Sequence, residues 1–445
     1  MHTTPPLSLE PLRFRMPAVE HRLLSNGTAV HVICSPTQDL FSITVAMRTG
    51  AIHDEVPGNT SLAAQMLTRG TTTRTAAEFA LDVESRGCTI RSSADSETTT
   101  IRSSGLAEWF SDILGLIGGA IRSPRFDERE LHTLRSQILA DIQIDCTDVE
   151  WLALRACSQA NYGNHPYGRP RNGTPVSLQS ITPEVLQSAH ERMLHAERHV
   201  IIAGPFRLED VYAQLEDTFG ALPVARSLSG APRAQPRYGA GVIAPKEDAV
   251  QTAFRIAMPC PPYLHADDVQ VQLLTSILGG HSLARLFSVL REEKGYTYGA
   301  YAFNDVRPHG AVTGIVTSVG NEFTADTMNT IATVLDEFAQ EQITDEEFDT
   351  SRQHVLGSFA RSNETPQQTA GLVWATILHG LPATYFTDLV AAMQQLTPFD
   401  VGDAQRTWFN RERWIVGMAG KEDVLRKAIT PFVSTVETWD NTFYR

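Results

Sequence analysis

The sequence predicts an α+β protein made of two homologous halves, each a mostly antiparallel sheet with helices packed on one face. Two observations lead to this fold class: landmarks of the first half recur in the second, and strand and helix periods are mixed within each half. A chain of 445 residues, 42% of them hydrophobic, is long enough to bury more than one core. Two such halves facing each other would enclose a cleft.

The internal repeat has three landmarks that return in the same order at nearly one spacing. They are an acidic helix start, an apolar-Thr-Pro helix start, and a short apolar strand that ends in Ala-Gly. One match alone is weak, whereas three in order indicate a duplication. The matching pairs are residues 128–131 and 345–348, residues 181–183 and 396–398, and residues 200–204 and 416–420.

Within each half, the individual elements follow from hydrophobic period and capping residues. Apolar residues alternate over 41–47 and again over 253–258, which predicts half-buried strands. Helical spacing of apolar residues covers 109–117 and 269–278. Thr344 with Glu347 is the signature of a capping box, and Gly380 is placed to end a helix at His379.

The halves are separated by a stretch without periodicity that contains Pro232 and Pro236. The sequence therefore predicts a first domain over residues 16–225, a linker over 226–241 and a second domain over 242–440.

Charge and cysteine content limit the partners. With 37 basic and 51 acidic residues the formal charge is −14, which opposes binding to nucleic acid or to an anionic membrane. Five scattered cysteines without a C-x-x-C pair are expected to be free and mostly buried thiols. They are Cys34, Cys88, Cys146, Cys157 and Cys260.

The start of the chain predicts a location. Residues 1–16 contain no apolar core of signal-peptide length, so we expect a cytoplasmic protein. The alternative is the periplasm, if Met1 stands at the start of a chain whose signal peptide has been removed.

Common catalytic motifs such as a Walker loop, G-x-G-x-x-G, G-x-S-x-G and H-E-x-x-H are missing from the sequence. One cluster of possible metal ligands is present: His190, Glu191, His195, Glu197 and His199. The repeat places a strand from about residue 200, so His199 would lie outside the helix that carries the others. Structural histidines are the favoured interpretation, and a zinc site is the alternative.

Three tracts resemble the M16 (pitrilysin/insulinase) peptidase family: residues 165–182, residues 200–223 and residues 277–298. The last contains Leu290-Arg291-Glu292-Glu293-Lys294-Gly295-Tyr296-Thr297-Tyr298. The resemblance covers about Val19 to Ile429. It implies that the two halves form half of a clam-shell chamber completed by a second chain.

The resemblance fails at the zinc motif. Hydrolytic members of the family carry His-x-x-Glu-His on the helix after the first strands, and a distant glutamate is the third ligand. Here Ser61 stands at the first histidine, Ala64 at the catalytic glutamate and Gln65 at the second histidine, and Asp141 is the candidate for the third ligand. None of the first three can replace the family residue, so no metal is expected in this chain and zinc is expected in a partner subunit.

Arg291 and Tyr298 match the pair that, in the family, holds the peptide backbone beside the scissile bond. Such donors lower the barrier because the tetrahedral intermediate gains negative charge on oxygen. The simpler interpretation makes Arg291 a surface cation at a helix end and Tyr298 a half-buried strand aromatic. With the surrounding tract matched, the functional interpretation is favoured.

The sequence thus predicts the non-zinc subunit of a two-subunit, M16B-type zinc metalloendopeptidase. Its partners would be a zinc-bearing M16B subunit, in a heterodimer, and a peptide or unfolded polypeptide substrate. The alternative is a non-catalytic structural or peptide-binding subunit of a larger complex. An independent metalloenzyme that uses the histidine cluster is the third possibility.

Overall fold

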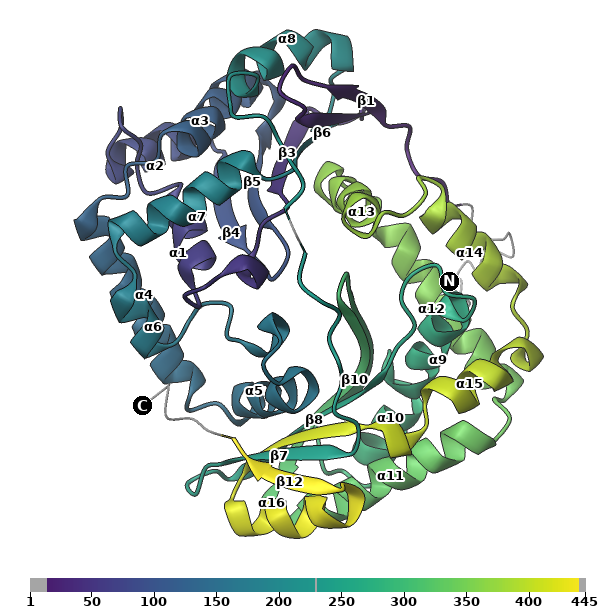
Figure 1. Cartoon of the computed structure of the whole chain (residues 1–445). Coiled ribbons are helices and arrows are strands. Elements are labelled where there is room, and N and C mark those ends of the chain that lie inside the picture. Colours follow the sequence, from purple (N-terminus) through teal and green to yellow (C-terminus); the bar gives the residue numbers. More distant parts are fainter. Residues whose placement is uncertain (1–13, 229, 440–445) are drawn as a thin grey trace, which may run out of the picture.

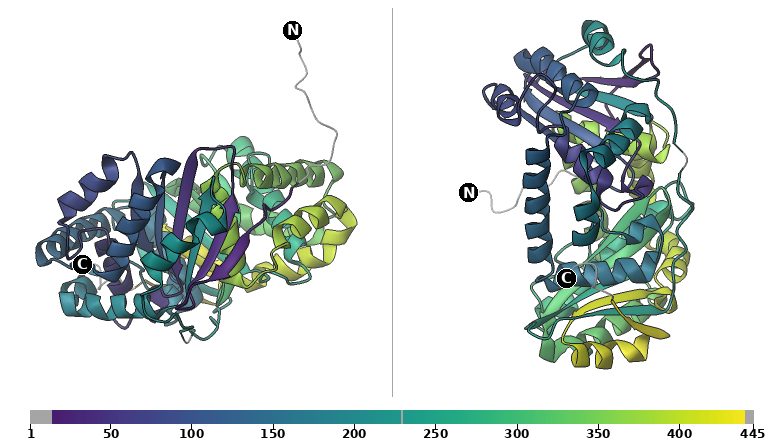
Figure 2. Two further views of the ribbon diagram at one scale, coloured as in Figure 1. Left: turned by 90° about the horizontal axis from the view of Figure 1, so that it is seen from above. Right: turned by 60° about the vertical axis from the view of Figure 1, so that its left-hand side comes forward.

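The computed structural model describes residues 14–228 and 230–439. The last residue of the predicted second domain, 440, and residue 229 of the predicted linker lie outside these ranges. Two six-stranded sheets form the centres of two halves, which lie side by side (Figures 1 and 2). The predicted α+β fold with two homologous halves is confirmed.

The strand order is the same in both sheets. The first runs β1-β2-β6-β3-β5-β4 and the second β12-β7-β11-β8-β10-β9. Only the edge strand beside β2 or β7 differs. In the first sheet it is β1, the first strand in the chain, which runs antiparallel to β2. In the second sheet it is β12, the last strand in the chain, which runs parallel to β7. The strands are β1 (Glu20–Leu23), β2 (Ala29–Cys34), β3 (Leu40–Met47), β4 (Thr89–Ala94), β5 (Thr99–Leu106), β6 (Arg198–Gly204), β7 (Ala240–Pro245), β8 (Gln251–Pro259), β9 (Ala300–Arg307), β10 (Gly310–Gly320), β11 (Ile415–Gly420) and β12 (Thr435–Thr438).

Helices of each half cover the outer face of its own sheet and bury one large apolar cluster there. The first half contains α1 (Asn59–Met66), α2 (Ala76–Glu84), α3 (Phe110–Arg122), α4 (Glu128–Asp145), α5 (Val149–Tyr162), α6 (Pro175–Ser180), α7 (Pro183–His195) and α8 (Leu208–Phe219). The second contains α9 (Asp268–Gly279), α10 (Arg285–Phe287), α11 (Thr324–Gln340), α12 (Asp345–Arg361), α13 (Pro366–His379), α14 (Tyr385–Gln395), α15 (Gly402–Trp408) and α16 (Glu422–Ile429).

Helices α5 and α13 are exchanged between the halves. Helix α5 of the first half packs on β7, β8 and β11 of the second sheet, and α13 of the second half packs on β3 and β6 of the first sheet (Figure 1). Ala153 and Ala156 of α5 meet Ala253 and Ala419 in one small apolar cluster. Each sheet therefore has its inner face covered by a helix from the other half, a feature that the sequence did not predict.

The landmarks of the repeat occupy equivalent places. Asp127 caps α4 by accepting a hydrogen bond from the Arg129 amide, and Thr344 forms the predicted capping box with Glu347 at the start of α12. Helix α13 ends at His379, with Gly380 in the left-handed conformation as predicted.

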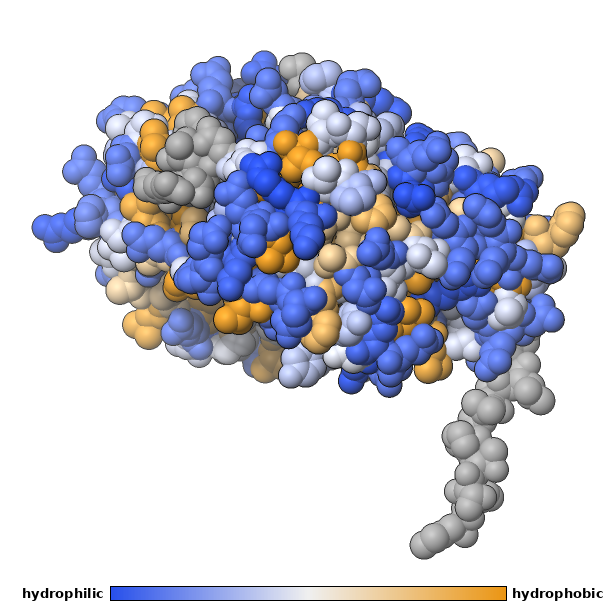
Figure 3. Space-filling view, turned by 90° about the horizontal axis from the view of Figure 1, so that it is seen from below, coloured by the Kyte–Doolittle hydropathy of each residue, from blue (hydrophilic) through white to orange (hydrophobic). Residues whose placement is uncertain are grey.

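The cysteines and the surface complete the description of the fold. All five cysteines are free thiols, and Cys88, Cys157 and Cys260 are buried. Seen from below, the surface is mostly hydrophilic, with apolar residues scattered among polar ones (Figure 3). Within the described ranges, no helix has the length and apolar character needed to cross a membrane.

Candidate functional site

Helix α1 carries the positions of the missing zinc motif, and its start is fixed by a buried carboxylate. Asp54 accepts hydrogen bonds from the Thr60 amide at 3.1 Å and forms an ion pair with Arg192 at 3.2 Å. Burial raises the pKa of Asp54, while the Thr60 hydrogen bonds and the Arg192 charge oppose that rise. Gly58 precedes the helix with φ of 92°, a conformation that favours glycine.

The motif positions separate into two environments. The Ser61 hydroxyl donates to Asn172 Oδ1 at 2.9 Å, and the Gln65 amide donates to Ser61 Oγ at 3.4 Å, so these two side chains lie together at a cavity of about 430 Å³. Ala64 is fully buried in the apolar core. Asp141 is exposed on α4 and does not line this cavity. In the described part of the chain, no group of three or more His, Cys, Asp or Glu side chains is placed to hold a metal ion.

The histidine cluster of the sequence is not brought to one site. His190 contacts the Ile121 carbonyl through Nε2 at 2.7 Å, near the end of α3. His195 lies in the last turn of α7. His199 belongs to β6, and its Nε2 contacts Glu197 Oε1 at 3.1 Å. The alternative of a zinc site built from His190, His195 and His199 is therefore wrong, because the chain passes from helix to strand between them.

A different row of histidines crosses the first sheet. His21 Nδ1 lies 2.8 Å from His31 Nδ1, and His31 Nε2 lies 3.1 Å from His199 Nδ1. Burial, together with the His199 and His21 charges, lowers the pKa of His31 to about 3. Trp374 of α13 packs beside His199. The sequence analysis missed this row, because it depends on the pairing of β1, β2 and β6.

Arg291 lies in a π-helical segment, Ser288–Glu293, that follows α10. Its guanidinium carbon is 4.7 Å from the centroid of the Phe287 ring, and its Nε is 3.6 Å from Glu292 Oε1. About half of the side chain is exposed. Single π-turns recur at functional sites, although this position also matches that of a surface cation at a helix end.

Tyr298 lies in the turn before β9, and not on the strand that the sequence predicted. The turn is anchored on both sides, because Tyr296 stacks on Phe323 and donates to Asp326, and Thr297 donates to the Gly299 carbonyl. Tyr298 itself is 92% exposed. The interpretation as a half-buried strand aromatic is therefore wrong.

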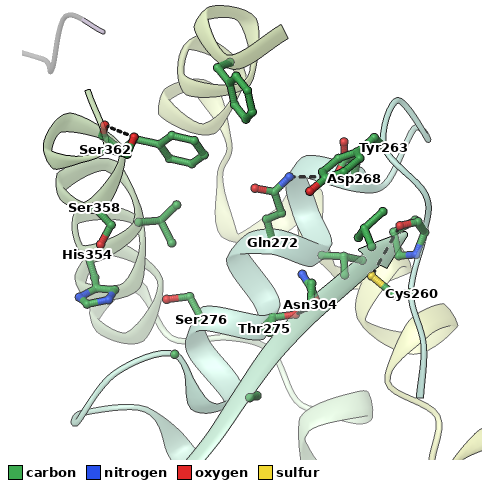
Figure 4. Close-up of a pocket in the computed structure, with 18 of the residues that line it drawn as sticks. Cys260, Tyr263, Asp268, Gln272, Thr275, Ser276, Asn304, His354, Ser358 and Ser362 are labelled. Atoms are coloured by element: carbon green, nitrogen blue, oxygen red, sulfur yellow. Dashed lines mark hydrogen bonds between the residues drawn. The ribbon is translucent and has the colours of Figure 1, made fainter. Parts of the chain in front are cut away.

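The second half has a cavity beside α9. It has a volume of about 470 Å³ and lies between α9, α12, α14 and β9 (Figure 4). Asp268 accepts hydrogen bonds there from the Tyr385 hydroxyl at 2.6 Å and the Gln272 amide at 2.9 Å. Val355 and Phe386 are among its apolar lining residues, so this cavity is more apolar than the one beside Ser61. The sequence offered no motif for it.

The sequence matches two family models. Residues 29–175 match "Insulinase (Peptidase family M16)" and residues 180–355 match "Peptidase M16 inactive domain". A Bacillus subtilis protein named "Uncharacterized zinc protease YmxG" is 23% identical, with 76% of this chain and 83% of the relative covered. A Helicobacter pylori protein named "Non-peptidase homolog YmxG" is 22% identical, with 78% of this chain and 80% of the relative covered.

Solved structures share the fold. A crystal structure titled as a peptidase M16 inactive domain from Pseudomonas fluorescens superposes with a TM-score of 0.84 at 23% identity, covering 91% of this chain and 98% of that one. A protease structure from Helicobacter pylori gives a TM-score of 0.83 at 18% identity, covering 91% and 100%. The chain belongs to the M16 peptidase family.

Proposed function

We propose that this chain is the metal-free subunit of a heterodimeric zinc metalloendopeptidase. In this assembly a second M16 chain carries the zinc ion. Arg291 and Tyr298 of this chain donate hydrogen bonds to the peptide substrate beside that zinc ion. The pair stabilises charge that grows on the peptide oxygen during attack by water.

The observation that carries the proposal is the exposure of Tyr298 on an anchored turn. A tyrosine that is 92% exposed adds little to a core, while the contacts of its neighbours Tyr296 and Thr297 fix the backbone that presents it. Arg291 supplies a planar fork of donors that suits carbonyl and oxyanion oxygens. Serine, alanine and glutamine on α1 leave the metal chemistry to the partner.

The test pairs this chain with a chain of similar length that bears His-x-x-Glu-His and is encoded by the same organism. We expect a heterodimer in size-exclusion chromatography and peptide hydrolysis only in the mixture. Tyr298→Phe and Arg291→Ala are each expected to lower kcat by about 10²–10³-fold with the heterodimer intact, since removal of one oxyanion donor has this cost. Phe399→Ala, which alters a side chain that is 91% exposed elsewhere on the second half, is the matched control.

A structural or peptide-binding subunit without a catalytic contribution is the second candidate. The name of the Helicobacter pylori relative, a non-peptidase homolog, favours it. Normal kinetics of both variants in an intact heterodimer would select this candidate and reject the first. Failure of the two chains to co-elute at micromolar concentration would also reject the catalytic heterodimer and favour the structural or peptide-binding subunit.

A further inference from the structure

Two arginines stand directly opposite each other on the inner face of the first sheet. Arg91 of β4 and Arg102 of β5 are register partners. Like charges at such positions repel and destabilise an antiparallel pair. Both side chains are exposed, and over residues 14–228 and 230–439 neither guanidinium has an acidic partner or a hydrogen bond. Among the residues that the structure describes, no acidic group therefore compensates the repulsion between Arg91 and Arg102.

The pair borders two adjoining cavities of about 820 and 430 Å³, which share Gln65, Ser93 and Arg102 as lining residues. Arg91 lines the larger cavity and Arg171 the smaller one. Arg171 is exposed, and it too has no acidic partner in the described ranges. Ser61 lines the smaller cavity, so Arg102 and Arg171 border the same cavity as the position where a zinc motif would stand.

Fewer acidic than basic residues line the two cavities. Asp95 is the acidic residue that lines the smaller cavity. Its Oδ1 accepts from the Glu97 and Thr98 amides at 2.7 Å each, which holds it in the turn between β4 and β5. Arg69 also lines the larger cavity, but it is paired with Glu130 at 3.4 Å. The cavities thus carry an excess of positive charge in a chain whose formal charge is −14.

We propose that this pair of cavities binds a carboxylate of an acidic peptide, at the place of the lost zinc site. The planar guanidinium fork binds carboxylates with two parallel hydrogen bonds, and the hydroxyl and amide groups of Ser93 and Gln65 can complete the contact. Phosphate has the same chemistry. The cavity volumes are those of sites for organic ligands and exceed what a bare inorganic anion fills, which favours the peptide.

The anion site stands on the arginines alone, and only the peptide nature of the ligand rests on the proposed function. The experiment therefore uses the full chain without a partner. Isothermal titration calorimetry compares the peptide Gly-Gly-Glu-Gly-Glu with its uncharged match, Gly-Gly-Gln-Gly-Gln-amide. Inorganic phosphate is the competitor, and Arg91→Ser and Arg102→Ser are the variants. Arg129→Ser is the control, because Arg129 is an exposed arginine of the same half, placed on α4 away from both cavities.

We expect the glutamate peptide to bind, and each cavity variant to weaken its binding about tenfold or more while the control leaves it unchanged. Binding should also weaken as salt rises. Because the two charges repel, Arg102→Ser should keep or raise the melting temperature, so lost binding will not reflect unfolding.

Three results would overturn the proposal: equal binding of the glutamine peptide, full binding by Arg102→Ser, or preferred binding of phosphate. Failure of the heterodimer assay while the lone chain still binds the glutamate peptide would reject the proposed function and leave the anion site in place.

Discussion

The two halves share a strand order but differ in how a helix from the other half meets each sheet. Under α5, the second sheet offers Gly417, and an added Cβ there would lie 2.4 Å from the Cys157 amide nitrogen. The equivalent position of the first sheet, under α13, is Ile201. By the same register, His31 of the first sheet corresponds to Val242 of the second. One interface is close and apolar, and the other is spaced by larger side chains and contains histidines.

The parts of the inner sheet faces that α5 and α13 do not cover also carry different residues in the two halves. The cross-strand pair Arg91 and Arg102 corresponds through register to Tyr301 and Val316 of the second sheet. A duplicated framework thus presents positive charge in one half and an exposed aromatic in the other. The comparison teaches that one strand order, with a large apolar cluster on each outer face, is compatible with different residues at equivalent positions of the inner faces.

Removal of the largest apolar side chain from the α13 interface should have the greatest effect. Trp374 is 7% exposed and packs against the first sheet. Trp374→Ala is expected to lower the unfolding free energy by about 3–5 kcal/mol, the usual cost of a large cavity. Urea unfolding followed by circular dichroism measures it, with the exposed Phe399→Ala as control. An unchanged midpoint would mean that α13 contributes little to the first half.

Replacing Gly417 of the second sheet by isoleucine, the residue at the equivalent position of the first sheet, should cause the next largest loss of stability. Gly417→Ile places a side chain where the α5 backbone lies, and overpacking of this kind costs about 1–3 kcal/mol. Ile201→Val on the first sheet is the matched change and should cost about 0.5–1.5 kcal/mol. If Gly417→Ile proved as mild as Ile201→Val, α5 would not be held close to its sheet.

The histidine row should make the first half sensitive to acid. His31 has a folded pKa of about 3 against about 6.5 in the unfolded chain, so between these pH values the unfolded chain binds the extra proton. Stability contributed by His31 is therefore complete above about pH 6.5 and falls as pH drops, by up to about 1.4 kcal/mol per pH unit. His199, whose pKa burial also lowers, acts in the same direction.

His31→Val introduces the residue of the second sheet and should flatten this dependence. The measurement is the difference in urea midpoint between pH 7.5 and pH 5 for the variant and the parent chain. An equal change in urea midpoint for the variant and the parent chain would show that His31 does not cause the loss of stability in acid.

The smallest effects should come from the equivalent helix caps. Asp127→Ala and Thr344→Ala each remove an N-cap acceptor, which costs about 1 kcal/mol. Thr344→Ala should cost more, because it also removes the hydrogen bond that the Thr344 hydroxyl donates to Glu347 at 2.9 Å. Two urea titrations decide the order, and an equal cost would show that the hydroxyl bond to Glu347 adds nothing measurable.

The sequence predicted what depends on local chemistry. Capping residues and hydrophobic period are written in neighbouring residues, so the duplicated helices and strands, and the cap at Thr344, could be predicted. The family tract predicted Arg291 and Tyr298 as the candidate pair, and their role stays a prediction. The turn before β9 was wrongly predicted as strand. It is held by the hydrogen bond from the Thr297 hydroxyl to the Gly299 carbonyl, and such a bond leaves no hydrophobic period in the sequence.

The features that escaped prediction depend on register between distant segments. The contact between His31 and His199 and the pairing of Arg91 with Arg102 exist only once particular strands are neighbours. The exchange of α5 and α13 escaped for a related reason. An apolar helix face in the sequence shows that a helix is buried, and does not show which sheet buries it.

The exchange of α5 and α13 also bears on how such a chain assembles. Each half has one helix that packs on the other half and an inner sheet face that is covered by a helix of the other half. Two copies of a single half could therefore cover each other's inner sheet faces as a domain-swapped pair. The fused chain is the tethered form of that pair, in which the connecting segment keeps each helix at high effective concentration beside the face it covers. A cut in that segment would leave two fragments that still hold each other, whereas either fragment alone would expose a bare sheet.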